Sequence, residues 1–448
     1  NPHFEEVRKV YQNIRVRPVD LAQGRVRIVN RHDFTDLAAF AGSWELSADT
    51  RDVLARGDLG ILELAAHDSI ELALPLPPIA AAPGVEYFLR VEFRTRAERP
   101  FLPAGWLVAW EQFELPVYLE PAPVDPAAGS ELLVSEGADV VRIEGRDFSL
   151  DIDRTSGLIG SYRFRGAELI LSGPEPNYWR APTDNDYGNR MPQRQAMWRE
   201  ASRFRVLEDI EVVRVRPSEV RIESSFRVPE VRATHNLSYT VLGTGDIRIT
   251  SRFVPDPEAL ATAQVPDLPR FGLNLRVNGD FDRVDWYGRG PHENYRDRFT
   301  SAPVGVYEAT AAELYYPYIR PQENGNRMQA RWVALTDGHG LGLLVVGAPT
   351  LDWSALRYTQ EDLDEGPTKT GRHTYDLVER EFVSVNLDLA QLGVGGDNSW
   401  GAQPLEEYQL PYGEYAYSLH LRPLAPDLAP PMALSKQRLT GDTHDATR

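Results

Sequence analysis

Residues 148–164 read FSLDIDRTSGLIGSYRF, two strand-like runs on either side of a Thr-Ser-Gly turn. In the first run, Phe148, Leu150 and Ile152 alternate with polar residues, as expected for a strand that buries one face. Runs of this kind recur along most of the chain. The stretch 193–201 is the best candidate for a helix, and it is short. The chain is therefore predicted to be all-β.

Short strands dominate the first part of the chain. Alternating apolar and polar residues mark runs at 10–16, 25–29, 69–74, 87–93 and 106–115. We expect strand from residue 7 onward, over 7–16. Roughly seven short strands in about 115 residues are typical of an immunoglobulin-like sandwich. Because the chain has no Cys, this sandwich would lack the usual disulfide and be a fibronectin-like relative.

A larger β domain is expected after a linker rich in Pro and Ala. Its further strands are predicted at 220–228, 237–242, 247–254, 272–277, 331–336, 341–346, 382–387 and 415–421. The end of the chain is rich in Pro, Ala, Thr and Asp and is expected to be poorly ordered. The predicted division is 1–120 for the immunoglobulin-like sandwich, 121–130 for the linker, 131–425 for the large β domain and 426–448 for the tail.

The composition narrows the possible partners. With 48 Lys and Arg against 66 Asp and Glu, the formal net charge is −18, which repels phosphate backbones and anionic lipid. No apolar run approaches the roughly 20 residues of a membrane span. We therefore predict no nucleic-acid partner and no membrane partner. The chain starts at Asn1 without Met or an apolar leader. This start is expected either for a processed or trimmed terminus or for the later part of a longer polypeptide cut at a domain junction.

Motifs for metals and nucleophiles are weak. None of the nine His residues has HExxH or HxH spacing, so no zinc site is expected. Residues 183–188, TDNDYG, are similar to part of a calcium loop but lack its full spacing and closing Glu. A turn in which Asp and Asn side chains bond their own backbone is favoured there. The sequence contains no Gly-x-Ser-x-Gly elbow and no Gly-rich phosphate loop.

Aromatic residues among polar ones point to carbohydrate. Indole and phenol faces stack on the apolar face of a pyranose, while carboxylates and amides bind its hydroxyls. The candidates are Trp179, Trp198, Trp286, Tyr287, Tyr295, Tyr315, Tyr316, Tyr318, Trp332, Trp353, Tyr358 and Trp400. Most of them, taken singly, are expected in the core. Trp400 differs because 393–401 is a glycine-rich loop, on which an indole is expected to be exposed.

Five segments resemble, in order, motifs of the large bacterial β-galactosidases of glycoside hydrolase family 2. They are WRAPTDND (179–186), YGRGPHENYRDR (287–298), YPYIRPQENG (316–325), RY (357–358) and GVGGDNSW (393–400). The resemblance covers residues 1 to about 425. It implies the C-terminal portion of such an enzyme, with the family's second immunoglobulin-like domain followed by a galactose-mutarotase-like β supersandwich.

The resemblance also implies an activity, the retaining hydrolysis of terminal β-D-galactosides such as lactose. Both catalytic glutamates, the Mg and Na ions and most galactose contacts of the family lie in parts that this chain does not match. The chain alone is therefore expected to be inactive and to have no metal or cofactor of its own. Its implied partners are a β-galactoside, the remainder of the β-galactosidase chain and further copies in a homo-oligomer. The implied location is cytoplasmic.

One residue of the chain matches an active-site position of the family. Trp400 corresponds to the late tryptophan that forms one wall of the sugar site. The other motif residues are expected to hold loops or interfaces, and no catalytic role follows for them. They are Arg180, Asp184, Asn185, Asp186, His292, Glu293, Glu323 and Asn324.

Two other classes of function remain open. The first is a stand-alone carbohydrate-binding module. The second is an aldose epimerase, which needs a His and a Glu facing one pocket. His292, Glu293 and Glu323 are the candidates, although neighbouring His292 and Glu293 would diverge on a strand.

Overall fold

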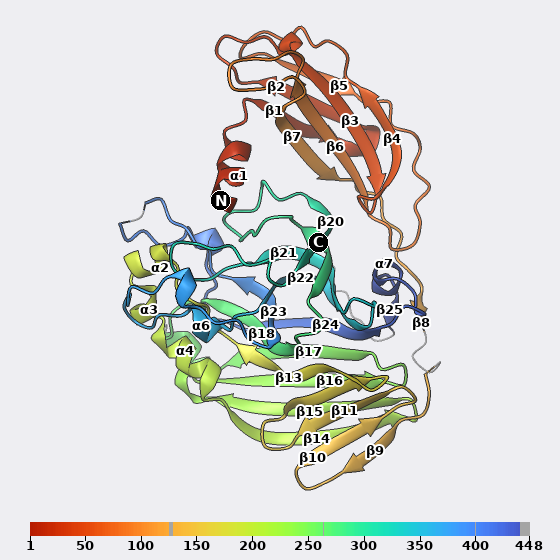
Figure 1. Cartoon of the computed structure of the whole chain (residues 1–448), viewed down its shortest axis with the longest axis vertical. Helices are drawn as coiled ribbons and strands as arrows, with labels where there is room; N and C mark the ends of the chain where they lie inside the picture. The colour runs from red at the N-terminus through yellow and green to blue at the C-terminus, as the bar shows by residue number, and fades with distance from the viewer. Residues whose placement is uncertain (125–128, 263, 399, 440–448) are drawn as a thin grey trace. The chain divides into compact units, whose positions relative to one another are not determined.

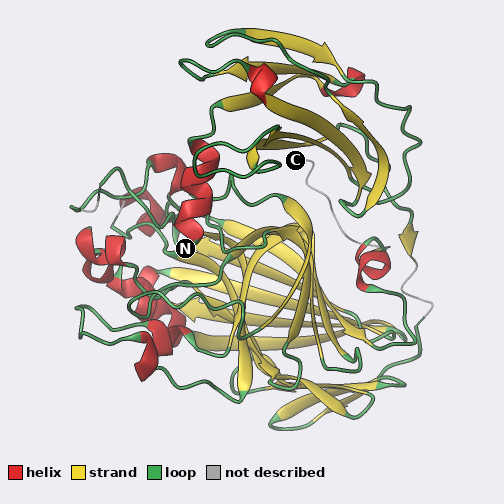
Figure 2. Cartoon of the chain, turned by 45° about the horizontal axis from the view of Figure 1, so that its top comes forward, coloured by secondary structure: helices red, strands yellow, loops and turns green. Residues whose placement is uncertain are grey.

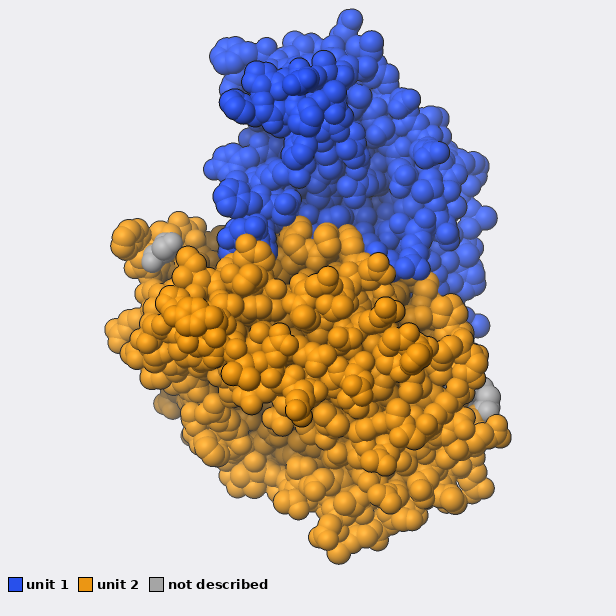
Figure 3. Space-filling model, in the orientation of Figure 1, with its two compact units in different colours: residues 1–122, 300–306, 436–438 blue, residues 123–299, 307–435, 439–448 orange. Residues whose placement is uncertain are grey.

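The computed structural model describes residues 1–124, 129–262, 264–398 and 400–439 (Figures 1 and 2). The chain forms two compact units, coloured separately in Figure 3. Unit 1 contains residues 1–122, 300–306 and 436–438, and unit 2 contains the remainder. Residues 125–128 of the predicted linker and 440–448 of the predicted tail lie outside the described residues. No helix in the described part of the chain is long and apolar enough to cross a membrane.

Unit 1 contains seven strands in two antiparallel sheets. The bounds are β1 (Ile14–Asp20), β2 (Arg25–Asn30), β3 (Phe40–Ala48), β4 (Asp52–Asp58), β5 (Ser69–Ala73), β6 (Tyr87–Thr95) and β7 (Leu107–Glu114). One sheet has the order β1-β2-β5 and the other β4-β3-β6-β7. Val26 and Ile28 from the first sheet share one fully buried core with Leu89 and Val91 from the second. The predicted immunoglobulin-like sandwich is confirmed.

The strand predicted over 7–16 is wrong in its first half, because helix α1 (Pro2–Val10) occupies it. Asn1 caps this helix by accepting the His3 N–H at 3.0 Å. Proline lies in its first turn, where no N–H is needed, and basic residues lie in its last turn. These end signals outweigh the short apolar alternation that suggested a strand. β1 begins only at Ile14.

Unit 2 is built on one large, curled antiparallel sheet, visible in Figure 2. The strands of this sheet are β9 (Leu133–Glu136), β10 (Val140–Glu144), β11 (Phe148–Asp153), β12 (Leu158–Phe164), β13 (Ala167–Asn177), β14 (Val206–Arg216), β15 (Glu219–Val228), β16 (Ala233–Leu242), β17 (Ile247–Pro255), β18 (Arg270–Asn278), β19 (Arg283–Arg289), β20 (Val304–Thr310), β21 (Arg327–Thr336), β22 (Gly342–Leu356), β23 (Phe382–Gln391) and β24 (Tyr415–Leu424). All belong to unit 2 except the first three residues of β20, which are assigned to unit 1. The main path runs β14-β15-β16-β17-β24-β22-β23-β18-β13-β12-β11-β10-β9. The predicted all-β class is confirmed.

The hairpin read from residues 148–164 is β11 and β12. Phe148 pairs with Phe164, and Leu150 pairs with Tyr162. The turn requires Gly157, because its φ is +71° and a Cβ there would lie 2.7 Å from Leu207 Cδ1. The alternating apolar residues of both strands are buried in the core of unit 2.

Short helices gather at one end of the strands of unit 2 (Figure 1). They are α2 (Asp184–Gly188), α3 (Met191–Arg194), α4 (Ala196–Arg203) and α6 (Gln360–Leu363). The helix predicted at 193–201 is confirmed, although it divides at Gln195 into α3 and α4. A further helix, α5 (Pro257–Thr262), follows β17.

The described part of the predicted tail is folded. Residues 431–435 form α7 (Pro431–Ser435), and β25 (Arg438–Leu439) pairs with β8 (Pro123–Val124). Leu434 and Leu439 are both buried. The expectation of a poorly ordered tail is therefore wrong for residues 431–439, because two apolar side chains attach this stretch to the fold.

Candidate functional site

The segment 180–186 starts helix α2 with its own side chains. Asp186 N–H donates to Thr183 Oγ1 at 3.2 Å, and Thr183 N–H donates to Asp186 Oδ2 at 2.8 Å. This reciprocal capping box satisfies backbone donors that the start of a helix leaves unpaired. The stretch predicted as an Asx-type turn is thus a capped helical turn. Asp186 bonds the local backbone as predicted, but its partner in the cap is Thr183, and the Asn185 side chain instead donates to the distant Val394 carbonyl.

A buried ion pair links α2 to the preceding chain. Arg180 Nη2 lies 2.9 Å from Asp186 Oδ1, and both side chains are excluded from solvent. The same Nη2 donates to the carbonyl of Gly393 at 3.1 Å. Burial raises the pKa of the Asp186 carboxyl, although the Arg180 charge opposes that rise.

Residues 393–401 form what we call the Trp400 loop, of which residue 399 lies outside the described residues. Trp400 is 93% exposed, in agreement with the exposure predicted from its glycine neighbours. Asn185 Nδ2 donates to the Val394 carbonyl at 3.2 Å. Gly395 N–H donates to Asp297 Oδ2 at 2.7 Å. The base of the loop is thus bonded by side chains from two other motifs.

Glu293 lies in a second buried network. Its carboxylate accepts hydrogen bonds from Arg298 Nη2 at 2.7 Å, from the Tyr318 hydroxyl and from the Gly325 N–H at 2.8 Å. Asn324 bonds the Tyr316 backbone on both sides, because its Oδ1 accepts the N–H and its Nδ2 donates to the carbonyl. Glu293 and Asn324 therefore shape the segment 316–325.

Glu323 shares one guanidinium with a second carboxyl group. Arg270 Nη2 donates to both Glu323 oxygens at 3.1 Å, and Arg270 Nε lies 3.3 Å from Asp388 Oδ2. Burial raises the pKa of Glu323 and raises that of Asp388 to about 8. Gly272 leaves room for this carboxyl, since a Cβ there would lie 1.8 Å from Asp388 Oδ1.

Asp184 and His292 make contacts of a different kind. The Asp184 carboxylate is exposed and pairs with Arg320 Nε at 3.1 Å and Lys369 Nζ at 2.5 Å. His292 is half-buried, and its carbonyl accepts a hydrogen bond from Asn294 Nδ2 at 3.0 Å. Among the residues that the structure describes, no three His, Asp or Glu side chains gather as a metal site requires. The absence of a metal from this part stays a prediction.

A family model described as the β-galactosidase small chain matches residues 144–421. The chain belongs to this β-galactosidase family. A second model, β-galactosidase domain 4, matches residues 26–116. The family resemblance inferred from the five motifs is therefore confirmed.

Curated β-galactosidases align along most of the chain. That of Priestia megaterium is 33% identical over 429 residues, which are 95% of this chain and 40% of that enzyme. That of Streptococcus thermophilus is 28% identical, over 94% of this chain and 39% of that enzyme. The chain thus spans about two fifths of the length of these relatives. A solved galactose 1-epimerase from Lactobacillus acidophilus aligns with a TM-score of 0.34 and 9% identity, over 65% of this chain and 97% of its own.

In this β-galactosidase family member, six of the predicted motif residues fall into two groups. Arg180, Asn185 and Asp186 meet at the base of the Trp400 loop. Glu293, Glu323 and Asn324 belong to the buried networks around 316–325. Asp184 pairs with Arg320 of the same segment, and the His292 carbonyl accepts a hydrogen bond from Asn294.

Three residues of these networks escaped the sequence analysis. Asp297 lies inside the quoted motif 287–298, so its position could have been found, but nothing in the motif indicated its partner. Arg270 and Asp388 lie on β18 and β23 and meet only because those strands pair. No local pattern marks them.

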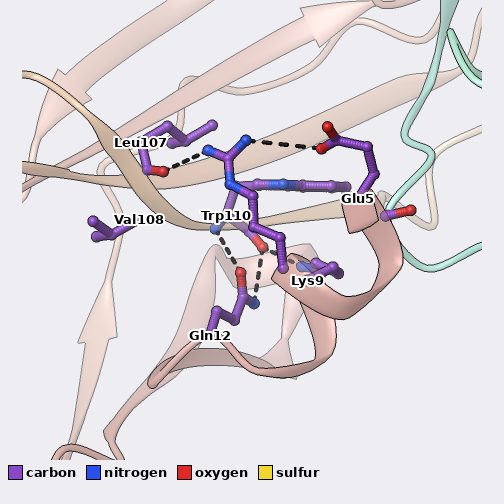
Figure 4. A pocket seen from close by; sticks show the side chains of 8 residues that line it. Glu5, Lys9, Gln12, Leu107, Val108 and Trp110 are labelled. Carbon is purple, nitrogen blue, oxygen red and sulfur yellow. Dashed lines mark hydrogen bonds and ion pairs between the residues drawn. The ribbon is translucent and has the colours of Figure 1, made fainter. Parts of the chain in front are cut away.

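Unit 1 contains a small polar pocket, drawn in Figure 4. α1 and β7 line it, and Gln12 Nε2 donates to the Trp110 carbonyl at 3.3 Å and to Glu111 Oε1 at 3.0 Å. Lys9 Nζ lies 2.8 Å from Glu111 Oε1 and also donates to the Trp110 carbonyl. These groups bond one another, so the pocket serves to dock α1 on β7.

Proposed function

We propose that this chain is the C-terminal part of a β-galactosidase and that it contributes Trp400 to the sugar site of the complete enzyme. The complete enzyme would hydrolyse terminal β-D-galactosides such as lactose with retention. The observation that carries the proposal is the 93% exposed indole on a loop bonded at its base by family-motif residues. Such an indole face stacks on the apolar face of a pyranose.

The bond-breaking chemistry would come from outside this chain. Retaining hydrolysis needs two carboxyl groups about 5–5.5 Å apart, one as acid and base and one as nucleophile. The motif glutamates do not suit this work, because Glu293 is buried against Arg298 and Glu323 against Arg270. The rest of the enzyme would supply both catalytic glutamates, the Mg and Na ions and most galactose contacts. Assembly as a homo-oligomer in the cytoplasm stays a prediction.

The hydrogen bonds of Glu293 and Glu323 also weaken the epimerase alternative. An epimerase base must be free to take a proton at C1 of the sugar. The Glu293 carboxylate already accepts three hydrogen bonds, and Glu323 accepts two from one guanidinium. Neither group is available beside His292 for this role.

The test is Trp400→Ala in the complete enzyme. Loss of one stacked face should reduce kcat/KM by roughly 10- to 100-fold, in line with about 1–3 kcal/mol of apolar contact. The melting temperature should stay unchanged, because an exposed indole packs against little. Trp106→Ala, which removes a partly exposed indole from unit 1, is the matched control and should leave kcat/KM unchanged. Wild-type kcat/KM in Trp400→Ala would refute the proposal.

A further inference from the structure

We propose that Arg180, Asn185 and Asp297 are positioning residues that fix the Trp400 loop, so that the indole meets the sugar in one place. The inference rests on the proposed function of Trp400 and names the side chains on which that function depends. None of the three would touch the sugar, and each would act through the loop backbone.

The loop has little means of fixing itself. Gly393, Gly395, Gly396 and Gly401 make up four of its nine residues, and glycine loses more conformational freedom on ordering than any other residue. The described part of the loop contains no strand or helix. Within it, Trp400 N–H donates to Asn398 Oδ1 at 2.8 Å, a contact between neighbours that moves with the loop. Its placement must therefore come from other segments.

Three consecutive residues at the base of the loop receive such contacts. Arg180 donates to the carbonyl of Gly393, Asn185 donates to that of Val394, and Asp297 accepts from the N–H of Gly395. Donors and an acceptor together fix both the position and the orientation of this backbone.

The glycines at the base allow the acidic side chain to approach. A Cβ on Gly393 would lie 2.7 Å from Asp297 Oδ2, and a Cβ on Gly395 would lie 3.4 Å from it. The first distance is shorter than any real contact permits, so Gly393 is required for this arrangement. The 2.7 Å bond from Gly395 N–H to the carboxylate has the length of a charge-assisted hydrogen bond.

The C-terminal end of the Trp400 loop lies close to α2, the helix that carries Asn185. Gly401 has a φ of +123°, and a Cβ there would lie 3.4 Å from the carbonyl of Gly188, the last residue of α2. Gly396 approaches the Ala402 carbonyl, to which a Cβ would lie 2.6 Å away. The end of the loop therefore lies against the end of α2, and the middle of the loop lies against the residue that follows it.

Hydrogen exchange of this 448-residue chain tests the contacts directly. Asp297→Ala should speed exchange of the Gly395 amide about tenfold or more, because that amide loses its acceptor. Asp297→Asn should rescue much of the protection, since its amide oxygen can still accept. Asn185→Ala should speed exchange across 393–401 several-fold without threatening the fold, because its side chain is only half-buried. The matched control is Asp184→Asn, because Asp184 lies on the same helix but pairs with Arg320 and Lys369. This substitution should leave exchange across residues 393–401 unchanged.

Unchanged exchange of residues 393–401 in both Asp297→Ala and Asn185→Ala would overturn the inference. This outcome does not depend on what Trp400 does. The exchange measurement therefore separates failure of the positioning role from failure of the proposed function.

A double-mutant cycle in the complete enzyme tests the consequence. Asp297→Ala should lower kcat/KM about fivefold to tenfold with Trp400 present, and should have no further effect in the Trp400→Ala enzyme. A purely structural role would instead lower kcat/KM equally in both backgrounds, and that result would also overturn the inference.

Discussion

The Asp388 carboxyl lies fully buried against Arg270, whose guanidinium also contacts Glu323. One positive charge cannot fully compensate two buried negative ones. Burial raises the pKa of Asp388 to about 8, with the nearby Glu323 charge adding to that effect and Arg270 opposing it. Below about pH 8 the Asp388 carboxyl is therefore favoured in its protonated form.

This protonation makes stability depend on pH. The folded state keeps the Asp388 proton up to about pH 8, whereas an unfolded Asp releases it near pH 4. The contribution of Asp388 is therefore fully present below pH 4 and is lost as pH rises toward 8. Asp388→Asn, which imitates the protonated form, should remove a slope of up to about 1.4 kcal/mol per pH unit. Urea unfolding of the wild type and of Asp388→Asn at pH 5 to 8 measures this slope of the free energy of unfolding against pH.

A control residue has the opposite shift. Hydrogen bonding from the backbone of Ala259 lowers the pKa of the half-exposed Asp256, so the contribution of Asp256 to stability is lost only as pH falls below 4. Asp256→Asn should leave the slope between pH 5 and 8 unaltered. Equal slopes for Asp388→Asn and the wild type would contradict the prediction.

Single residues differ in how far sequence reveals them. The exposure of Trp400 was predictable because glycines on both sides of it are a local signal. The partners of Asp297 and Asp388 were not, because Gly395 lies 98 positions from Asp297 along the chain and Arg270 reaches Asp388 only through strand pairing. Long-range contacts of this kind depend on the register of a sheet, which one sequence does not define.

Among the elements, α2 connects stability to the site. Thr183→Ala removes the capping side chain and should lower the free energy of unfolding by about 1 kcal/mol. Thr183→Ser should restore most of it. Thr359 caps α6 with the same box to Asp362, so Thr359→Ala is a matched control with a similar expected loss. Exchange of residues 393–401 should rise only for Thr183→Ala, because α2, through Asn185 and Asp186, bonds the Trp400 loop and its Arg180 partner. A rise of equal size in both variants would contradict this role.

Strands were predictable where one face is buried and the other is not. β11 and β12 coincide with their predicted ranges because apolar residues alternate cleanly along them. β13 was missed, since Gly173, Pro174 and Pro176 oppose a strand locally. Its pairing with β12 and β18 accommodates them through shifts in register. The first half of the strand predicted over 7–16 is instead part of α1. The residues that define this helix, the cap Asn1 and the buried Lys9, are polar and so do not add to a pattern of apolar residues with helical spacing.

At the scale of the whole molecule, the proposed role is that of one part of a larger enzyme. The chain spans about two fifths of the length of its curated relatives, exposes the Trp400 indole and pairs Glu293 and Glu323 with arginines. A stand-alone carbohydrate-binding module would need more than this. One stacked face contributes about 1–3 kcal/mol, whereas even a Kd of 1 mM requires about 4 kcal/mol.

We therefore expect the 448-residue chain alone neither to hydrolyse a β-galactoside nor to bind galactose with a Kd below about 1 mM. Without a positioned acid and nucleophile, its turnover should be at least about 10⁴-fold below that of the complete enzyme. A chromogenic β-galactoside at high protein concentration measures the first property, and calorimetric titration with galactose measures the second. The Trp400→Ala chain identifies contamination, because residual turnover from another enzyme would not change with this substitution. Enzyme-like turnover that survives repurification would mean that the catalytic carboxylates lie in this chain, and micromolar binding of galactose would favour the binding-module alternative.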